Sequence, residues 1–167
     1  MRIALICPEV LLGMKKPQVM QGLHLVLPQW LEREVYQTFY SQCDGYKILD
    51  NGAAEKFSMP FKDLLKLAAD YGVDELVLPD VMGDAAKTRE AVDEAIDIVL
   101  TTSHKPFKLQ AVVQGRTQEE VDFMIQYYQK SAFIDVIALP RLINYPLGAW
   151  ARVNAMERMA NNDLPQK

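Results

Sequence analysis

The sequence has no long apolar run and few cysteines. Its apolar stretches fall short of the roughly 20 residues needed to cross a bilayer, and the first segment, MRIALICPEV, lacks the small-residue cleavage site typical of a signal peptide. The two cysteines, Cys7 and Cys43, follow no C-x-x-C or zinc-ligand spacing, so neither a disulfide framework nor a metal site is expected. We therefore expect a cytoplasmic protein without a membrane segment.

Glycine-rich phosphate-binding motifs are also missing. No G-x-G-x-x-G follows an apolar run and no G-x-x-x-x-G-K-[ST] occurs, so no cofactor is expected. The formal net charge of -4 does not suggest binding to a phosphate backbone by bulk electrostatics. A nucleic-acid enzyme can still carry a local basic face, although small basic groups are more often solvated surface. The candidate groups are Lys15 and Lys16; His104, Lys105 and Lys108; and Arg141, Arg152 and Arg158.

The chain does contain a globular balance of residues and a regular alternation of patterns. Of its 167 residues, 50% are hydrophobic and 24% are charged, which is typical of a globular domain. Short apolar runs start roughly 25 to 33 residues apart, a spacing that fits one strand plus one crossover helix. These runs are YKILDN, DELVLPDV, FKLQAVVQG and FIDVIALPR, and RIALICPE and LHLVLP predict two earlier strands. Their composition indicates parallel strands buried on both faces.

Between the apolar runs, several residues predict where helices begin. Ser58 is expected to cap one helix and Asp84 the next, and Thr117 with Glu120 forms a capping box. A last helix is expected from about Leu147 to Ala160. The apolar residues at helical spacing after the capping box are expected to be core: Val121, Met124, Ile125 and Tyr128.

Polar residues follow successive apolar runs, at the predicted carboxyl ends of the strands. They are Asp50 and Asn51, Asp80, Gln114 and Arg141. Such ends converge on one face of a barrel, so the sequence predicts an α/β fold with parallel β/α repeats of TIM-barrel type. A complete barrel needs about 250 residues. We therefore expect an incomplete barrel over residues 1–160 with a loose tail at 161–167, and a partner chain or self-association that completes the barrel.

The segment ILDNGAAE is a candidate site because a buried strand ends in polar groups. Burying Asp50 costs energy unless a partner bonds it. Asn51 and Glu55 add further polar side chains, and Gly52 permits either a turn or a ligand close to the backbone. An ordinary Asp-Asn-Gly turn explains the same composition equally well.

The segments LVLPDVMGD and AVVQG supply further candidates. Asp50 and Asp80, at neighbouring strand ends, can divide acid and base roles or bind the N–H groups of a purine-like base. Asp84 is expected to cap a helix instead. The amide of Gln114 offers a donor and an acceptor to a nucleobase edge, and the N–H of Gly115 can reach a carbonyl without obstruction.

The segment IALPR ends the last predicted strand. Leu139 and Pro140 present an apolar edge to a ligand. Arg141 is either a phosphate contact or a member of an ordinary surface ion pair.

The order and spacing of five segments resemble the tRNA-guanine transglycosylase superfamily, and more closely its phage and bacterial branch that inserts 7-deazaguanines into DNA. The segments are HLVLP, ILDNGAAE, LVLPDVMGD, AVVQGRTQEEV and VIALPR, within residues 23–150. The resemblance implies that guanine in DNA or tRNA is replaced by a 7-deazaguanine.

The resemblance also implies roles for the candidate residues. Asp50 matches the proton acceptor in the base pocket, and Asp80 matches the residue that holds the base edge. Gln114 and Gly115 match the groups that bond the base carbonyl, and the strand at 137–140 supplies backbone contacts.

The family reaction is a double displacement through a covalent sugar intermediate, which needs a carboxylate nucleophile. The resemblance places that aspartate on a later strand than those predicted here. Asp135, before a strand, and Asp163, in the tail, do not match it. The zinc-binding cysteines and histidine of the tRNA enzymes are also missing, which favours the DNA-type branch or a truncated product.

Two other classes of function fit the same residues. A barrel glycoside hydrolase or lyase can also use Asp50 and Asp80 as a carboxylate pair. Alternatively, the half barrel is a non-catalytic module that binds a base or a partner without turnover.

Overall fold

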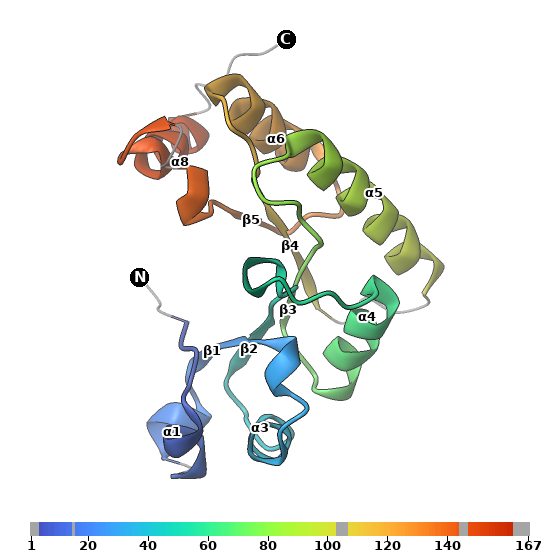
Figure 1. The fold of residues 1–167 in the computed structure, drawn as a ribbon, viewed down its shortest axis with the longest axis vertical. Helices are drawn as coiled ribbons and strands as arrows, with labels where there is room; N and C mark the ends of the chain where they lie inside the picture. Colours follow the sequence, from blue (N-terminus) through green and yellow to red (C-terminus); the bar gives the residue numbers. More distant parts are fainter. Residues whose placement is uncertain (1–3, 15, 103–106, 144–146, 162–167) are drawn as a thin grey trace. The chain divides into compact units, whose positions relative to one another are not determined.

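The computed structural model describes residues 4–14, 16–102, 107–143 and 147–161. In this part of the chain, five parallel strands alternate with helices and hydrogen-bond in the order β1-β2-β3-β4-β5 (Figure 1). The α/β class with parallel β/α repeats is thereby confirmed. The sequential strand order is that of barrel-type sheets, whereas the order reverses in doubly wound sheets. The strands are β1 (Leu23–Val26), β2 (Tyr46–Leu49), β3 (Glu75–Val77), β4 (Lys108–Val112) and β5 (Val136–Ala138).

The chain forms two compact units, one of residues 1–77 with 104–108 and one of residues 78–103 with 109–167. The helices of the first unit are α1 (Glu9–Gly13), α2 (Pro17–Met20), α3 (Glu34–Tyr40) and α4 (Phe61–Asp70), with 3-10 turns η1 (Pro28–Trp30) and η2 (Ala53–Glu55). Those of the second are α5 (Ala85–Thr101), α6 (Gln118–Lys130) and α8 (Ala151–Asn161), with η3 (Arg141–Ile143).

In the first unit, β1 and β2 alternate between half-buried and buried residues, whereas β3 is buried throughout. The predicted burial on both faces therefore holds for β3 alone among these strands. His24 of β1 packs against two aromatic residues of α3, Phe39 and Tyr40, which are 1% and 2% exposed. These contacts form the core of the first unit.

In the second unit, α5 and α6 lie side by side (Figure 1). The predicted core face of α6 is confirmed, because Val121, Met124, Ile125 and Tyr128 are each at most 1% exposed. The predicted capping box is also present, with the Glu120 N–H donating to Thr117 Oγ1 at 3.2 Å. Local sequence signals thus determine where α6 begins and which face is buried.

Three predicted boundaries are wrong. The helix assigned to a Ser58 cap begins at Phe61 with Pro60 as its N-cap and without a side-chain cap bond, because Ser58 lies too far from the first free N–H groups. The expected strand RIALICPE is reduced, among its described residues, to one bridge between Leu5 and His24, and it ends at Pro8, the N-cap of α1. The last helix begins at Ala151 rather than Leu147. The tail from residue 162 lies outside the described residues.

Candidate functional site

Asp80 lies in the second unit, three residues after the end of β3, and its carboxylate is bound by a buried glutamine. Gln114, which is 2% exposed, donates its Nε2 N–H to Asp80 Oδ2. The other end of the same amide, Oε1, accepts the Gly83 N–H at 2.9 Å. The structure thus brings together two predicted site residues that are far apart in the sequence.

The loop from Val81 to Asp84 is held at both of its ends. Thr88 Oγ1 accepts the Val81 N–H at 2.9 Å and donates to the Val81 carbonyl at 3.1 Å. Asp84 accepts the Lys87 N–H at 3.0 Å, so the predicted N-cap of α5 is confirmed. Gly83, with φ of 69°, takes a conformation that favours glycine. The loop beside Asp80 is therefore well fixed.

Arg116 is a candidate that sequence reasoning missed. Its side chain lies against Gly83, where an added Cβ would come 3.2 Å from Arg116 Nε. The pKa of Asp84 lies below its usual value, chiefly because of the hydrogen bond from the Lys87 N–H and further because of the Lys87 and Arg116 side chains. In the sequence, Arg116 could have been found from its position two residues after Gln114, within the segment AVVQGRTQEEV. Arg116 thus places a cation beside the loop that follows Asp80.

Gly115 is buried, but its close neighbour is a helix of the same unit. A Cβ at this position would come 2.9 Å from Glu120 Cβ and 3.2 Å from Val121 N. The Arg116 N–H also donates to Glu120 Oε2 at 2.6 Å. The packing of α6 alone thus requires glycine here, and the role of the Gly115 N–H toward a base carbonyl stays a prediction.

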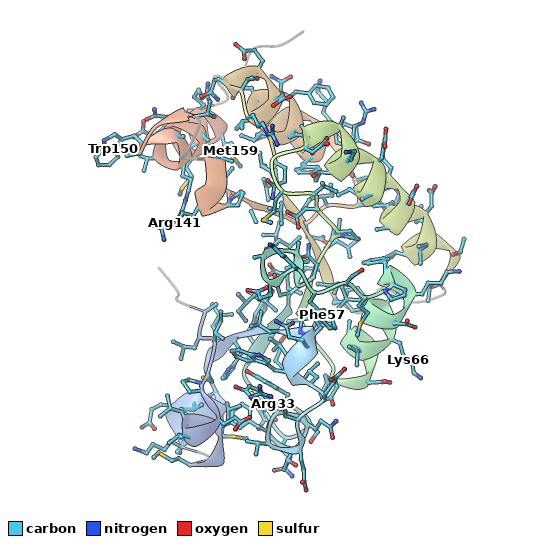
Figure 2. All side chains as sticks on the ribbon, in the orientation of Figure 1. Arg33, Phe57, Lys66, Arg141, Trp150 and Met159 are labelled. Atoms are coloured by element: carbon cyan, nitrogen blue, oxygen red, sulfur yellow. The ribbon has the colours of Figure 1, made fainter. Side chains whose placement is uncertain are left out.

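The third predicted group of this unit follows β5. Because Val112 pairs with Ala138, Leu139 and Pro140 leave β5 at the same end at which Gln114 leaves β4. Leu139 and Pro140 are half-buried. Arg141 is exposed, and its side chain extends away from the ribbon in Figure 2.

The predicted site residues of the first unit form a tight turn after β2. Asp50 Oδ2 accepts the Gly52 N–H at 3.1 Å, and Asn51 Oδ1 accepts the Ala53 N–H at 2.9 Å. Gly52 has a φ of 76°, and an added Cβ would come 3.0 Å from the Phe57 side chain. These contacts are those of the Asp-Asn-Gly turn that composition allowed. Glu55, in η2, is exposed.

Asp135 has a structural role. Its Oδ2 accepts the Leu109 N–H at 2.8 Å, and its own N–H donates to the Leu109 carbonyl at 3.0 Å. Asp74 makes the same pair of bonds to Lys47 in the first unit, at 2.8 and 2.9 Å. Both aspartates therefore join neighbouring strands at their amino ends. Asp163, the other aspartate considered as a nucleophile, lies outside the described residues.

Within the described ranges, no group of three or more histidine, cysteine or acidic residues is arranged to hold a metal ion. No helix of the same ranges has both the length and the apolar character required to cross a bilayer. Comparison of the chain with protein-family models, with curated proteins and with solved structures found no match.

Proposed function

We propose that this chain binds a guanine-like base at the carboxyl end of β3 and takes part in base exchange, in which guanine in DNA or tRNA is replaced by a 7-deazaguanine. The resemblance of its five segments to the transglycosylase superfamily supports this function, as does the sequential order of its parallel strands. The observation that carries the proposal is the Asp80 carboxylate held by the buried Gln114 amide.

The chemistry of guanine suits this carboxylate. The base presents adjacent N–H donors on its ring nitrogen and on its exocyclic amine. A carboxylate has about four lone-pair positions on two oxygens, so Asp80 can accept both base donors while it accepts the Gln114 N–H. Paired hydrogen bonds to an ionised group are stronger and more specific than neutral ones.

The resemblance gives Asp50 the role of proton acceptor, Gly115 that of a donor to the base carbonyl, and the strand that ends at Leu139 and Pro140 that of a backbone contact. The chemistry of their side chains or backbone makes four further residues candidates for substrate contacts: Asn51, Gly52, Glu55 and Arg141. A partner chain, or a second copy of this one, supplies the nucleophilic carboxylate. The expected location of this reaction is the cytoplasm.

The binding of 7-deazaguanine to the full chain, measured by calorimetry, tests the proposal. Asp80→Ala is expected to weaken binding about 5- to 150-fold, because unmatched N–H groups in a dry pocket cost about 1 to 3 kcal/mol. Asp84→Ala is the matched control, since Asp84 caps α5 in the same loop, and it should leave the affinity nearly unchanged. Equal losses in both variants, or no binding by the wild-type chain, would contradict the proposal.

A base-binding module without catalysis is the second candidate. The observation that favours it is the structural role of Asp135, whose carboxylate is bound to the start of β4. Binding of 7-deazaguanine without incorporation, even when the products of neighbouring genes are added, would support this alternative. Binding of sugars in preference to 7-deazaguanine would instead favour a glycoside hydrolase or lyase.

A further inference from the structure

The Gln114 amide is committed at both of its ends. Its Nε2 donates to Asp80 Oδ2, and its Oε1 accepts the Gly83 N–H at 2.9 Å. The opposite orientation of the amide would place its oxygen against the carboxylate and its NH2 group against the Gly83 N–H. Both contacts would be repulsive, so the two neighbours fix the orientation of the amide.

We propose that Gln114 is a positioning residue that acts on a bound base through Asp80, rather than a direct ligand of the base. This inference rests on the proposed function, in which Asp80 binds the base. The side chain of Gln114 joins the Asp80 carboxylate to the loop at Gly83, and it is 2% exposed. A single buried amide therefore holds both the acceptor and the loop beside it.

The two bonds reduce the rotation of the carboxylate before a base arrives. Groups that are already ordered lose less conformational entropy on binding, which raises affinity without a new contact. A direct bond from Gln114 to the base carbonyl would instead require the amide to leave Asp80 or Gly83. Direct binding would thus break one of the contacts that hold the site.

A double-mutant cycle on the full chain separates the two roles. The affinity for 7-deazaguanine is measured by calorimetry in the wild type, Gln114→Ala, Asp80→Ala and the double variant. Gln114→Ala is expected to weaken binding about tenfold, but to add no further loss once Asp80 is alanine, because its effect passes through Asp80. Equal losses from Gln114→Ala in both backgrounds would overturn the positioning role and leave the proposed function standing.

A second probe, 7-deaza-6-thioguanine, tests a direct bond to the carbonyl. It keeps the N–H donors of the base but replaces the carbonyl oxygen with sulfur, a weaker acceptor. If Gln114 acts only through Asp80, Gln114→Ala weakens the binding of both probes by the same factor. A smaller loss with the thio analogue would identify Gln114 as a ligand of the carbonyl. Absence of any binding by the wild-type chain would overturn the proposed function, and this inference with it.

Gln114→Glu tests the same role if Gln114→Ala fails to fold. It is nearly isosteric and keeps an acceptor for the Gly83 N–H, but it sets a second carboxylate against Asp80. Like charges in contact repel each other, and the carboxylate has no N–H to donate to Asp80. The variant should therefore weaken the binding of 7-deazaguanine at least as much as Gln114→Ala does. Wild-type affinity in the folded Gln114→Glu variant would count against the positioning role.

Discussion

His24, on β1, is fully buried, and its ring has a single hydrogen bond among the described residues. Nε2 lies 2.7 Å from the Val19 carbonyl and donates to it, whereas Nδ1 has no hydrogen-bond partner within the described part of the chain. The Phe39 and Tyr40 rings each make an edge-to-face contact with the imidazole, with ring centroids 5.5 Å apart. The pKa of His24 is lowered from its ordinary value of 6.5, chiefly by burial and further by the charge of Lys47. The hydrogen bond to Val19 opposes this shift. The ring is therefore neutral in the folded state at neutral pH.

The lowered pKa of His24 predicts acid sensitivity. As pH falls, the unfolded chain binds a proton at its ordinary pKa before the folded chain does, so the stability due to neutral His24 is complete above about pH 6.5 and decreases below it. The melting temperature should therefore fall between about pH 7 and pH 5. His24→Gln, which keeps a donor for the Val19 carbonyl, should show a smaller fall. His104→Gln is the matched control, and a smaller fall in that variant instead would contradict the assignment to His24.

Two helices of the second unit are joined by an ion pair. Arg158 on α8 donates from Nη1 to Asp122 Oδ2 at 3.0 Å, and its Nη2 lies 2.7 Å from Oδ1. Gln118 on α6 donates to Asp122 Oδ1 at 2.9 Å. The Asp122 side chain is 10% exposed and that of Arg158 is 27% exposed. These hydrogen bonds and the ion pair thus offset the free-energy cost of burying the Asp122 carboxylate.

Removal of the arginine charge should loosen α8. Arg158→Met keeps most of the aliphatic packing but leaves the Asp122 carboxylate with one partner fewer. The expected loss of stability is about 1 to 3 kcal/mol, below that of a fully buried pair because Arg158 is partly exposed. Hydrogen exchange of the α8 amides and urea unfolding measure it. Arg33→Met, in the exposed pair with Glu9 at 2.9 Å, is the control and should cost less than about 1 kcal/mol. A cost for Arg158→Met no larger than that of the control would contradict the role of the ion pair.

For the molecule as a whole, we predict that the isolated chain does not incorporate 7-deazaguanine into DNA or tRNA. Exchange through a covalent intermediate needs a carboxylate against the sugar carbon, and loss of such a nucleophile usually costs several orders of magnitude in rate. The Asp135 carboxylate does not match this nucleophile, because it accepts the Leu109 N–H at the amino ends of β4 and β5. The assay incubates labelled 7-deazaguanine with nucleic acid and the chain, with and without the product of an adjacent reading frame. Robust incorporation by the chain alone would show that it holds the nucleophile.

Exposed apolar side chains occur in both units, which is consistent with the expected self-association or partner. Val10 of the first unit and Trp150 of the second are each 71% exposed, and Trp150 points away from α8 in Figure 2. Large exposed apolar residues are common at interfaces, although single ones also occur on ordinary surfaces. The identity of the partner stays a prediction.

The elements of this fold were largely predictable because their signals are local. A cap needs a side-chain oxygen within three residues of a free N–H, as in the Asp84 bond to Lys87 and the Thr117 bond to Glu120. The spacing of apolar runs likewise predicted parallel strands that alternate with helices. The Ser58 error is of the same local kind, since the geometry of Pro60 moved the cap by two residues.

The partners of the candidate residues were decided by the tertiary structure. Gln114 is 34 residues from Asp80 and 31 from Gly83, and no local pattern relates residues at such separations. The sequence by itself determined that Asp80 and Gln114 follow strands and that position 115 has no side chain. Only the contacts among the loop after Asp80, the end of β4 and α6 determined that both ends of the Gln114 amide are used and that α6 packs only against a glycine at position 115. Hydrogen-bond direction and steric contact depend on distances that chain order does not define.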